Sequence, residues 1–153
     1  MEDVELVLRF FALIEDHYKS YKKTKEKQFK DFLSDTLALK NKLDTNKIDE
    51  YALLFRNTMK FIHDNFGDLA FAKYKYDDNV LKKQSNFNAA VYDALSVAIA
   101  SEVNLNNSNI TKDKVAAFKN LFRNQTFFEY VNGSILDSTK LIYRVNLARE
   151  IFK

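Results

Sequence analysis

Apolar residues recur along most of this chain at spacings of three and four, the pattern of helices that bury one side. In residues 4–18, VELVLRFFALIEDHY, one apolar stripe runs along the helix, and Leu6, Phe10 and Leu13 widen it. A helix docked on a single surface needs roughly a third of its circumference to be apolar. Because most of this helix is apolar, we expect it to be wedged between neighbouring helices.

The same spacing predicts further helices along the rest of the chain. We expect them at about residues 25–43, 49–65, 86–103, after 111, at 125–131 and from 138 to the end. We expect one more short turn at residues 69–74 and an irregular connection at the polar residues 76–83. Residues 105–110, LNNSNI, predict a loop. Together these elements predict an all-α fold, a single-domain bundle of about six or seven helices.

The helix predicted at residues 86–103 has the composition of a central helix. Asp93 is the only charged residue between Lys83 and Glu102. Several alanines allow neighbouring helices to approach closely, and valine, leucine and isoleucine fill the space between them. Ser85 or Asn86 is placed to cap its start, because either side chain can accept a hydrogen bond from a free N–H group of the first turn.

Composition supports this fold and excludes several kinds of site. The chain has 153 residues, 14 Phe and 8 Tyr, but no Pro and only two Gly, so few residues interrupt helices. The two glycines, Gly67 and Gly133, are far apart, which excludes glycine-rich phosphate loops. Gly67 is expected to end the helix at residues 49–65, because glycine readily takes the left-handed cap conformation. Absence of Cys excludes disulfides and thiolate metal sites. Without a basic-then-apolar leader or an apolar run long enough to cross a membrane, we predict a cytoplasmic protein with no membrane partner and no cofactor.

Lysines cluster directly after the first predicted helix. Five of them alternate with aromatic and polar residues over a short stretch: Lys19, Lys22, Lys23, Lys25 and Lys27. One interpretation is a solvated linker, because like charges repel one another and stay hydrated. The other is a nucleic-acid-binding patch, in which the lysines contact phosphates and neighbouring tyrosines stack on bases. The net charge of +3 permits DNA contact without demanding it.

One enzymatic interpretation competes with that of ordinary surface residues. All-α metal phosphohydrolases of the HD type use a histidine, then a His-Asp dipeptide, then a distant aspartate. His17, His63-Asp64 and Asp93 occur in that order, and imidazole and carboxylate ligands suit a divalent metal that activates water. However, His63 falls on the polar side of its predicted helix, and the chain has no third histidine. We therefore predict no catalytic residues and no metal site.

Four stretches of the chain resemble one known family. The sequence ELVLRFFAL at Glu5–Leu13 resembles an E-x-x-LRFFA signature, FGDLAF at Phe66–Phe71 resembles F-G-x-x-A-F, and FNAAVYDAL at Phe87–Leu95 resembles F-N-x-A-L-F-E-A. Arg144 stands where the family tends to have an arginine. These patterns belong to the helical second half of the "domain of unknown function 262" family, which includes the GmrSD modification-dependent restriction systems. Ala89 departs from the pattern, because the family often has an arginine there.

The resemblance implies a fragment of a larger protein. In that family the preceding half resembles ParB and sulfiredoxin-like folds and has a D-G-Q-Q-R motif linked to nucleotide hydrolysis, which is absent here. The whole protein would be an anti-phage restriction NTPase or nuclease acting on foreign DNA, and this chain its non-catalytic helical module. The alternative is a free-standing interaction module that binds a partner helix.

The apolar surplus of the first helix suggests where the missing half or a partner subunit docks. We expect the interface to include Leu6, Arg9, Phe10 and Leu13. For Arg9 two roles stay open. It can be a structural arginine whose stem packs and whose head pairs with acids, or it can face the partner and help to form a joint site.

Overall fold

The computed structural model describes residues 2–21, 28–104, 111–132 and 137–153, and confirms the all-α prediction. Those ranges contain seven α-helices: α1 (Glu2–Leu13), α2 (Phe29–Lys40), α3 (Thr45–Phe66), α4 (Ala89–Asn104), α5 (Lys112–Asn120), α6 (Gln125–Asn132) and α7 (Ser138–Phe152). Three short 3-10 turns accompany them: η1 (His17–Ser20), η2 (Gly67–Leu69) and η3 (Leu121–Arg123). One hairpin is formed by β1 (Lys73–Asp77) and β2 (Val80–Ser85). No helix of the described ranges combines the length and the hydropathy that a membrane crossing requires.

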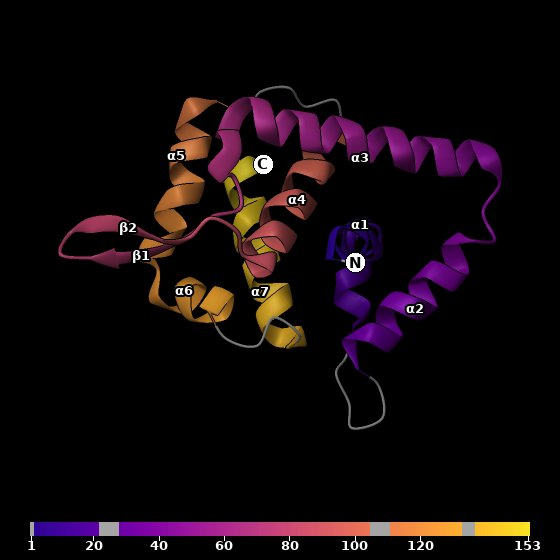
Figure 1. Ribbon diagram of the computed structural model, residues 1–153, viewed down its shortest axis with the longest axis horizontal. Helices are drawn as coiled ribbons and strands as arrows, with labels where there is room; N and C mark the ends of the chain where they lie inside the picture. Colours follow the sequence, from indigo (N-terminus) through magenta and orange to yellow (C-terminus); the bar gives the residue numbers. More distant parts are fainter. Residues whose placement is uncertain (1, 22–27, 105–110, 133–136) are drawn as a thin grey trace.

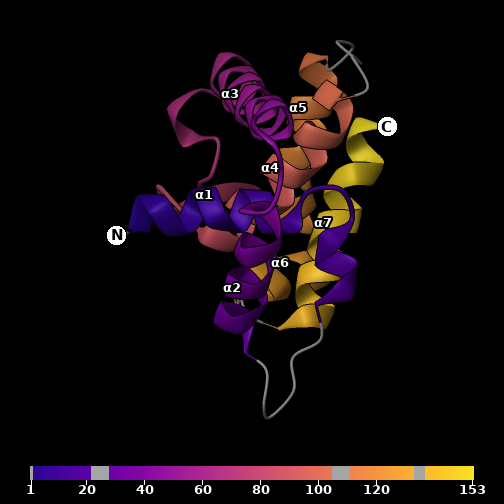
Figure 2. The ribbon, with the colours of Figure 1, turned by 90° about the vertical axis from the view of Figure 1, so that its right-hand side faces the viewer.

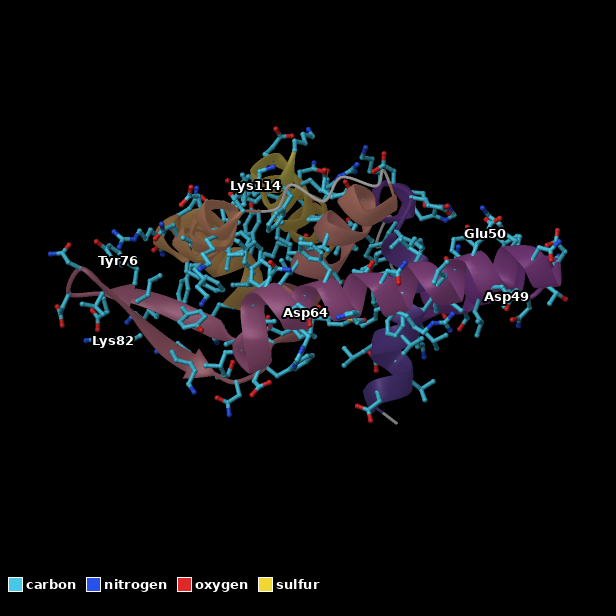
Figure 3. The ribbon with its side chains drawn as sticks, turned by 90° about the horizontal axis from the view of Figure 1, so that it is seen from above. Asp49, Glu50, Asp64, Tyr76, Lys82 and Lys114 are labelled. Atoms are coloured by element: carbon cyan, nitrogen blue, oxygen red, sulfur yellow. The ribbon has the colours of Figure 1, made fainter. Side chains whose placement is uncertain are left out.

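Helix α4 lies in the middle of the molecule, with α7 beside it (Figures 1 and 2). Helices α5 and α6 flank this pair on one side, α1 and α2 lie on the other, and α3 spans the top of both (Figure 1). The hairpin projects from the α5–α6 side, and Tyr76 and Lys82 lie on this projection (Figure 3).

The central position predicted for α4 is confirmed by its burial. Every side chain from residue 90 to residue 100 is buried, and the helix contributes to all three apolar clusters of the core. Ala94 and Ala98 share one of these clusters with Ala148 of α7. Small side chains on both helices therefore let the two backbones approach closely, as the alanine content predicted.

Helix α1 is wedged between its neighbours, as its wide apolar surface predicted. On one side Phe10 packs edge-on against Phe55 of α3, with ring centroids 5.1 Å apart, and belongs to a cluster with Tyr92 of α4. On the other side Leu13 belongs to a cluster with residues of α2 and α7. Most of the wide apolar surface of α1 is therefore buried against other helices of this chain.

Local capping chemistry determines where α2 and α3 begin. Gln28 and Asp31 form a capping box at the start of α2, which therefore begins at Phe29 rather than near residue 25. Asp44 accepts a hydrogen bond from the Lys47 N–H at 2.8 Å, so α3 begins at Thr45, four residues earlier than predicted. Gly67 ends α3, as predicted, with φ 67° and ψ −164°, a region essentially restricted to glycine.

The prediction of an irregular connection at residues 76–83 is wrong, because these residues form most of an antiparallel hairpin. Asp78 and Asn79 make its turn, with φ 48° and 63°. Two-residue hairpin turns of this kind need positive φ at both positions, which glycine usually supplies and which Asp and Asn tolerate. Tyr74 anchors β1 on the body by packing edge-on against Phe122, with centroids 5.5 Å apart. The short turn expected at residues 69–74 is found in its first part, where Ala72 N–H donates to the Leu69 carbonyl at 3.1 Å directly after η2, whereas Lys73 and Tyr74 belong to β1.

Asn88 joins the hairpin to two helices. Its side-chain oxygen accepts from the N–H groups of Ala90 and Val91, both at 3.0 Å, and caps α4 in place of the predicted Ser85 or Asn86. Its amide donates to the Val131 carbonyl of α6 at 3.2 Å. We expect Asn88→Ala to lower the free energy of unfolding by about 1–3 kcal/mol, because it removes a helix cap and a further hydrogen bond.

Asn86→Ala is the matched control, because Asn86 is exposed. This variant should change the free energy of unfolding by no more than about 0.5 kcal/mol. Urea denaturation followed by circular dichroism measures both variants. Equal destabilisation by the two would show that Asn88 is not the cap.

Candidate functional site

Three buried charged side chains from distant parts of the chain meet in the core. Arg9 Nε donates to Asp93 Oδ1 at 2.9 Å, and a second nitrogen of Arg9 donates to Asp93 Oδ2. Arg144 also donates to Asp93 Oδ2, at 2.9 Å. At most 1% of each residue is exposed, so water contributes little to solvating their charges.

The three residues come from α1, α4 and α7 and are 84 and 51 positions apart in sequence. The N-terminal end of α2 covers this charge cluster, because the Phe29 ring lies under the Arg9 guanidinium with its centroid 4.7 Å from Cζ. Arg144 also donates to the Tyr130 carbonyl of α6 at 3.5 Å. The charge cluster is therefore a junction of the first, central and last helices.

The electrostatics favour paired charges in this core. Burial opposes the charge of Arg9, but its ion pairs with Asp93 and, at 3.6 Å, with the exposed Glu5 more than offset this, so the pKa of Arg9 is raised. For Arg144 burial is the larger effect, and it lowers the pKa despite the attraction of Asp93. An arginine stays protonated in proteins even so, because its ordinary pKa exceeds about 12. The cluster thus holds two cations and one anion.

This arrangement suits positioning better than proton transfer. Both oxygens of Asp93 accept hydrogen bonds from guanidinium groups, so the carboxylate is held in place by side chains of two other helices. Arg9 has a buried stem and a head paired with an acid, which is the structural one of its two expected roles.

The other residues expected at an interface are mostly inside the chain. Phe10 and Leu13 have no exposed surface, and Leu6 is half-buried. Arg9, Phe10 and Leu13 contact the chain's own helices, so in this structure they present no free surface to another chain.

The lysine-rich stretch is described only at its first member. Lys19 is exposed and forms an ion pair with Asp16 at 2.9 Å. Lys22, Lys23, Lys25 and Lys27 lie outside the described residues. Their expected role in nucleic-acid binding therefore stays a prediction.

The residues of the HD-type hypothesis are not assembled. His63 is exposed on α3 and lies beside Asp64, which Figure 3 places on the same helix, whereas Asp93 is buried between two arginines. Within the part of the chain that the structure describes, no three His, Cys, Asp or Glu side chains are grouped so as to hold a metal ion.

The four stretches that resemble the restriction family converge in this region. Arg9, Asp93 and Arg144 form the charge cluster, and each comes from a different one of these stretches. The remaining stretch ends at Phe71, whose carbonyl accepts the Asn88 N–H at 2.9 Å, five residues before Asp93 in the sequence.

Sequence reasoning singled out Arg9 and Arg144 but missed that they share Asp93. A signal was present, because a lone acid in an otherwise apolar helix must find a cationic partner when it is buried. The sequence does not say which of the 24 basic residues supplies that partner.

Comparisons of the chain with known protein families, curated proteins and solved structures gave no match.

We expect Asp93→Asn to be the most damaging substitution in the charge cluster. It leaves two buried guanidinium groups with only the exposed Glu5, 3.6 Å from Arg9, as a counter-charge, which should cost about 3–5 kcal/mol. Arg9→Met or Arg144→Met leaves a neutral pair behind and should cost about 1–3 kcal/mol. Urea denaturation of the three variants measures how much each lowers the free energy of unfolding. An equal loss for either arginine variant and for Asp93→Asn would contradict this prediction.

Proposed function

We propose that the chain is a non-catalytic helical module of a GmrSD-like restriction system that targets foreign DNA. The observation that carries this proposal is the convergence of the four resembling stretches. Arg9, Asp93 and Arg144 join three helices through buried charges, and Asn88 ties the neighbouring turn to Phe71. Residues that resemble a family signature thus contact one another, which supports a shared fold for this part of the family.

The module acts by holding its helices rigid beside a catalytic half. A buried ion cluster restricts how its helices can pack, because any other arrangement would leave a charge unpaired. Asp93 is engaged by two arginines, so the most buried acid among the described residues contributes to structure. The chemistry then belongs to the half with the D-G-Q-Q-R motif.

Phage challenge tests the proposal. The complete gene that encodes this chain is expressed in a bacterial host, which is infected with phages that have modified or unmodified DNA bases. We expect fewer plaques from phages with modified bases, and recovery of the plaques when the segment encoding residues 1–153 is deleted. Unchanged plaque counts in the presence of the complete protein would overturn the proposal.

DNA binding through the lysine-rich stretch makes a separate prediction. For duplex DNA, each phosphate that a lysine no longer neutralises should flatten the plot of log affinity against log salt by about 0.9. We expect the triple variant Lys22→Ala, Lys23→Ala, Lys25→Ala to bind duplex DNA more weakly and to lower this slope by about 2–3. Fluorescence anisotropy of a labelled duplex at several salt concentrations measures both quantities.

The matched control removes three lysines elsewhere: Lys42→Ala, Lys47→Ala and Lys60→Ala. Lys47 and Lys60 already pair with Glu50 and Asp64, so their removal should leave the slope nearly unchanged. Binding that does not depend on salt, or equal effects of the two triple variants, would exclude the lysine-rich stretch as the DNA-binding element.

A free-standing module that binds a partner helix is the second candidate. Large apolar side chains are exposed on the first three helices, including Val4 at 62%, Leu39 at 63% and Leu53 at 51%. Exposed apolar side chains of this size are common at interfaces with other proteins when they lie together. The gene upstream of Met1 separates the candidates, because a D-G-Q-Q-R motif encoded there supports the restriction module.

A further inference from the structure

A pocket of about 240 Å³ opens between α1, α2 and α3. Its walls are almost entirely apolar, and the larger lining side chains include Leu8, Phe11, Leu33, Leu37, Ile48 and Tyr51. Polar lining residues include Thr36 and, at the C-terminal end of α2, the consecutive Lys40 and Asn41. The pocket therefore combines an apolar body with one cationic, hydrogen-bonding end.

Lys40 is a largely buried cation that lacks a hydrogen-bond acceptor among the described residues. Its side chain is 14% exposed, and the nearest carboxylate oxygen, Oε2 of Glu15, is 4.0 Å from Nζ, beyond hydrogen-bonding distance. That oxygen accepts a hydrogen bond from the Tyr51 hydroxyl at 2.6 Å. The ammonium lies over the Tyr51 ring, 3.8 Å from its centroid. Burial lowers the pKa of Lys40, although Glu15 opposes this shift.

Asn41 supplies a second donor at the same end of the pocket. Its backbone N–H bonds to the Leu37 carbonyl, which ends α2 and holds the residue in place. A lysine ammonium has three donors and an asparagine amide has two. Asn41 is exposed, so water can reach its amide, whereas an acceptor beside the largely buried Lys40 would satisfy donors for which the described residues supply no hydrogen-bond acceptor.

We propose that this pocket binds a medium-chain fatty acid, with its alkyl chain among the leucines of α1 and α2 and its carboxylate between Lys40 and Asn41. A carboxylate is the acceptor that gives Lys40 a charge-assisted hydrogen bond. An alcohol of the same length would fill the pocket without a counter-charge, and an amine would be repelled. Glu15 opposes a second carboxylate nearby, so we expect affinity in the range of about 0.1–1 mM.

Octanoate is the probe, used below its micelle concentration, and octanol is its uncharged match. Methyl NMR of the leucine and isoleucine residues locates binding, and calorimetry gives the affinity. We expect Leu33, Leu37 and Ile48 methyl signals to move and octanoate to bind about tenfold more tightly than octanol, the difference expected for one charge-assisted hydrogen bond.

Three variants test the geometry. Lys40→Met should remove the preference for octanoate while leaving octanol binding unchanged. Lys47→Met is the matched control, because Lys47 also lies over the Tyr51 ring, at 5.3 Å, but pairs with Glu50 and does not line the pocket. Ala52→Phe should block both ligands, because Ala52 lines the pocket. Thermal unfolding of each variant shows whether the fold is retained.

Two outcomes would overturn the proposal. Equal binding of octanoate and octanol to the unaltered chain would make the pocket a plain apolar surface, suited to a partner helix. Absence of methyl shifts at octanoate concentrations of about 10 mM would show that the pocket binds no such ligand, since this exceeds the expected dissociation constant at least tenfold. Neither outcome bears on the restriction proposal, which rests on other residues.

Discussion

Pairing of buried charges is the constraint on which the arrangement of helices depends. Arg9, Asp93 and Arg144 are buried in α1, α4 and α7, and none of them could be buried alone without a large desolvation penalty. Their mutual contacts therefore define which face of each helix points inward. The apolar clusters around them then fill the space, with α4 contributing to all three.

The same constraint explains the place of α1. This helix has apolar residues on most of its circumference, so hydrophobicity alone would allow several orientations. The ion pair from Arg9 to Asp93 selects one of them, and it leaves Phe10 against α3 and Leu13 toward α2 and α7. Much of the surface expected to meet another half of the protein is consequently covered within the chain.

Surfaces away from the charge cluster offer the remaining opportunities for binding. The pocket between α1, α2 and α3 pairs an apolar body with Lys40, whereas the hairpin and the exposed leucines face solvent. The hairpin is separate from the pocket, whereas exposed leucines share α2 and α3 with it. None of these features includes Arg9, Asp93 or Arg144, so each can be tested without altering the junction at Asp93. The function of this fold therefore depends on the ligands or proteins that bind these surfaces. The charge cluster contributes by fixing the positions of the helices that form them.

The sequence by itself determined the all-α class, most helix positions and the central role of α4, because these follow from local periodicity and from a long run with one charge. It also showed that Gly67 would end a helix. It did not reveal the hairpin, whose turn uses Asp78 and Asn79 instead of glycine. Only the tertiary structure decided that Asp93 joins Arg9 and Arg144 and that Lys40 lines an apolar pocket. Such contacts link residues far apart in the chain, and periodicity along one helix says nothing about which distant residue completes a buried charge.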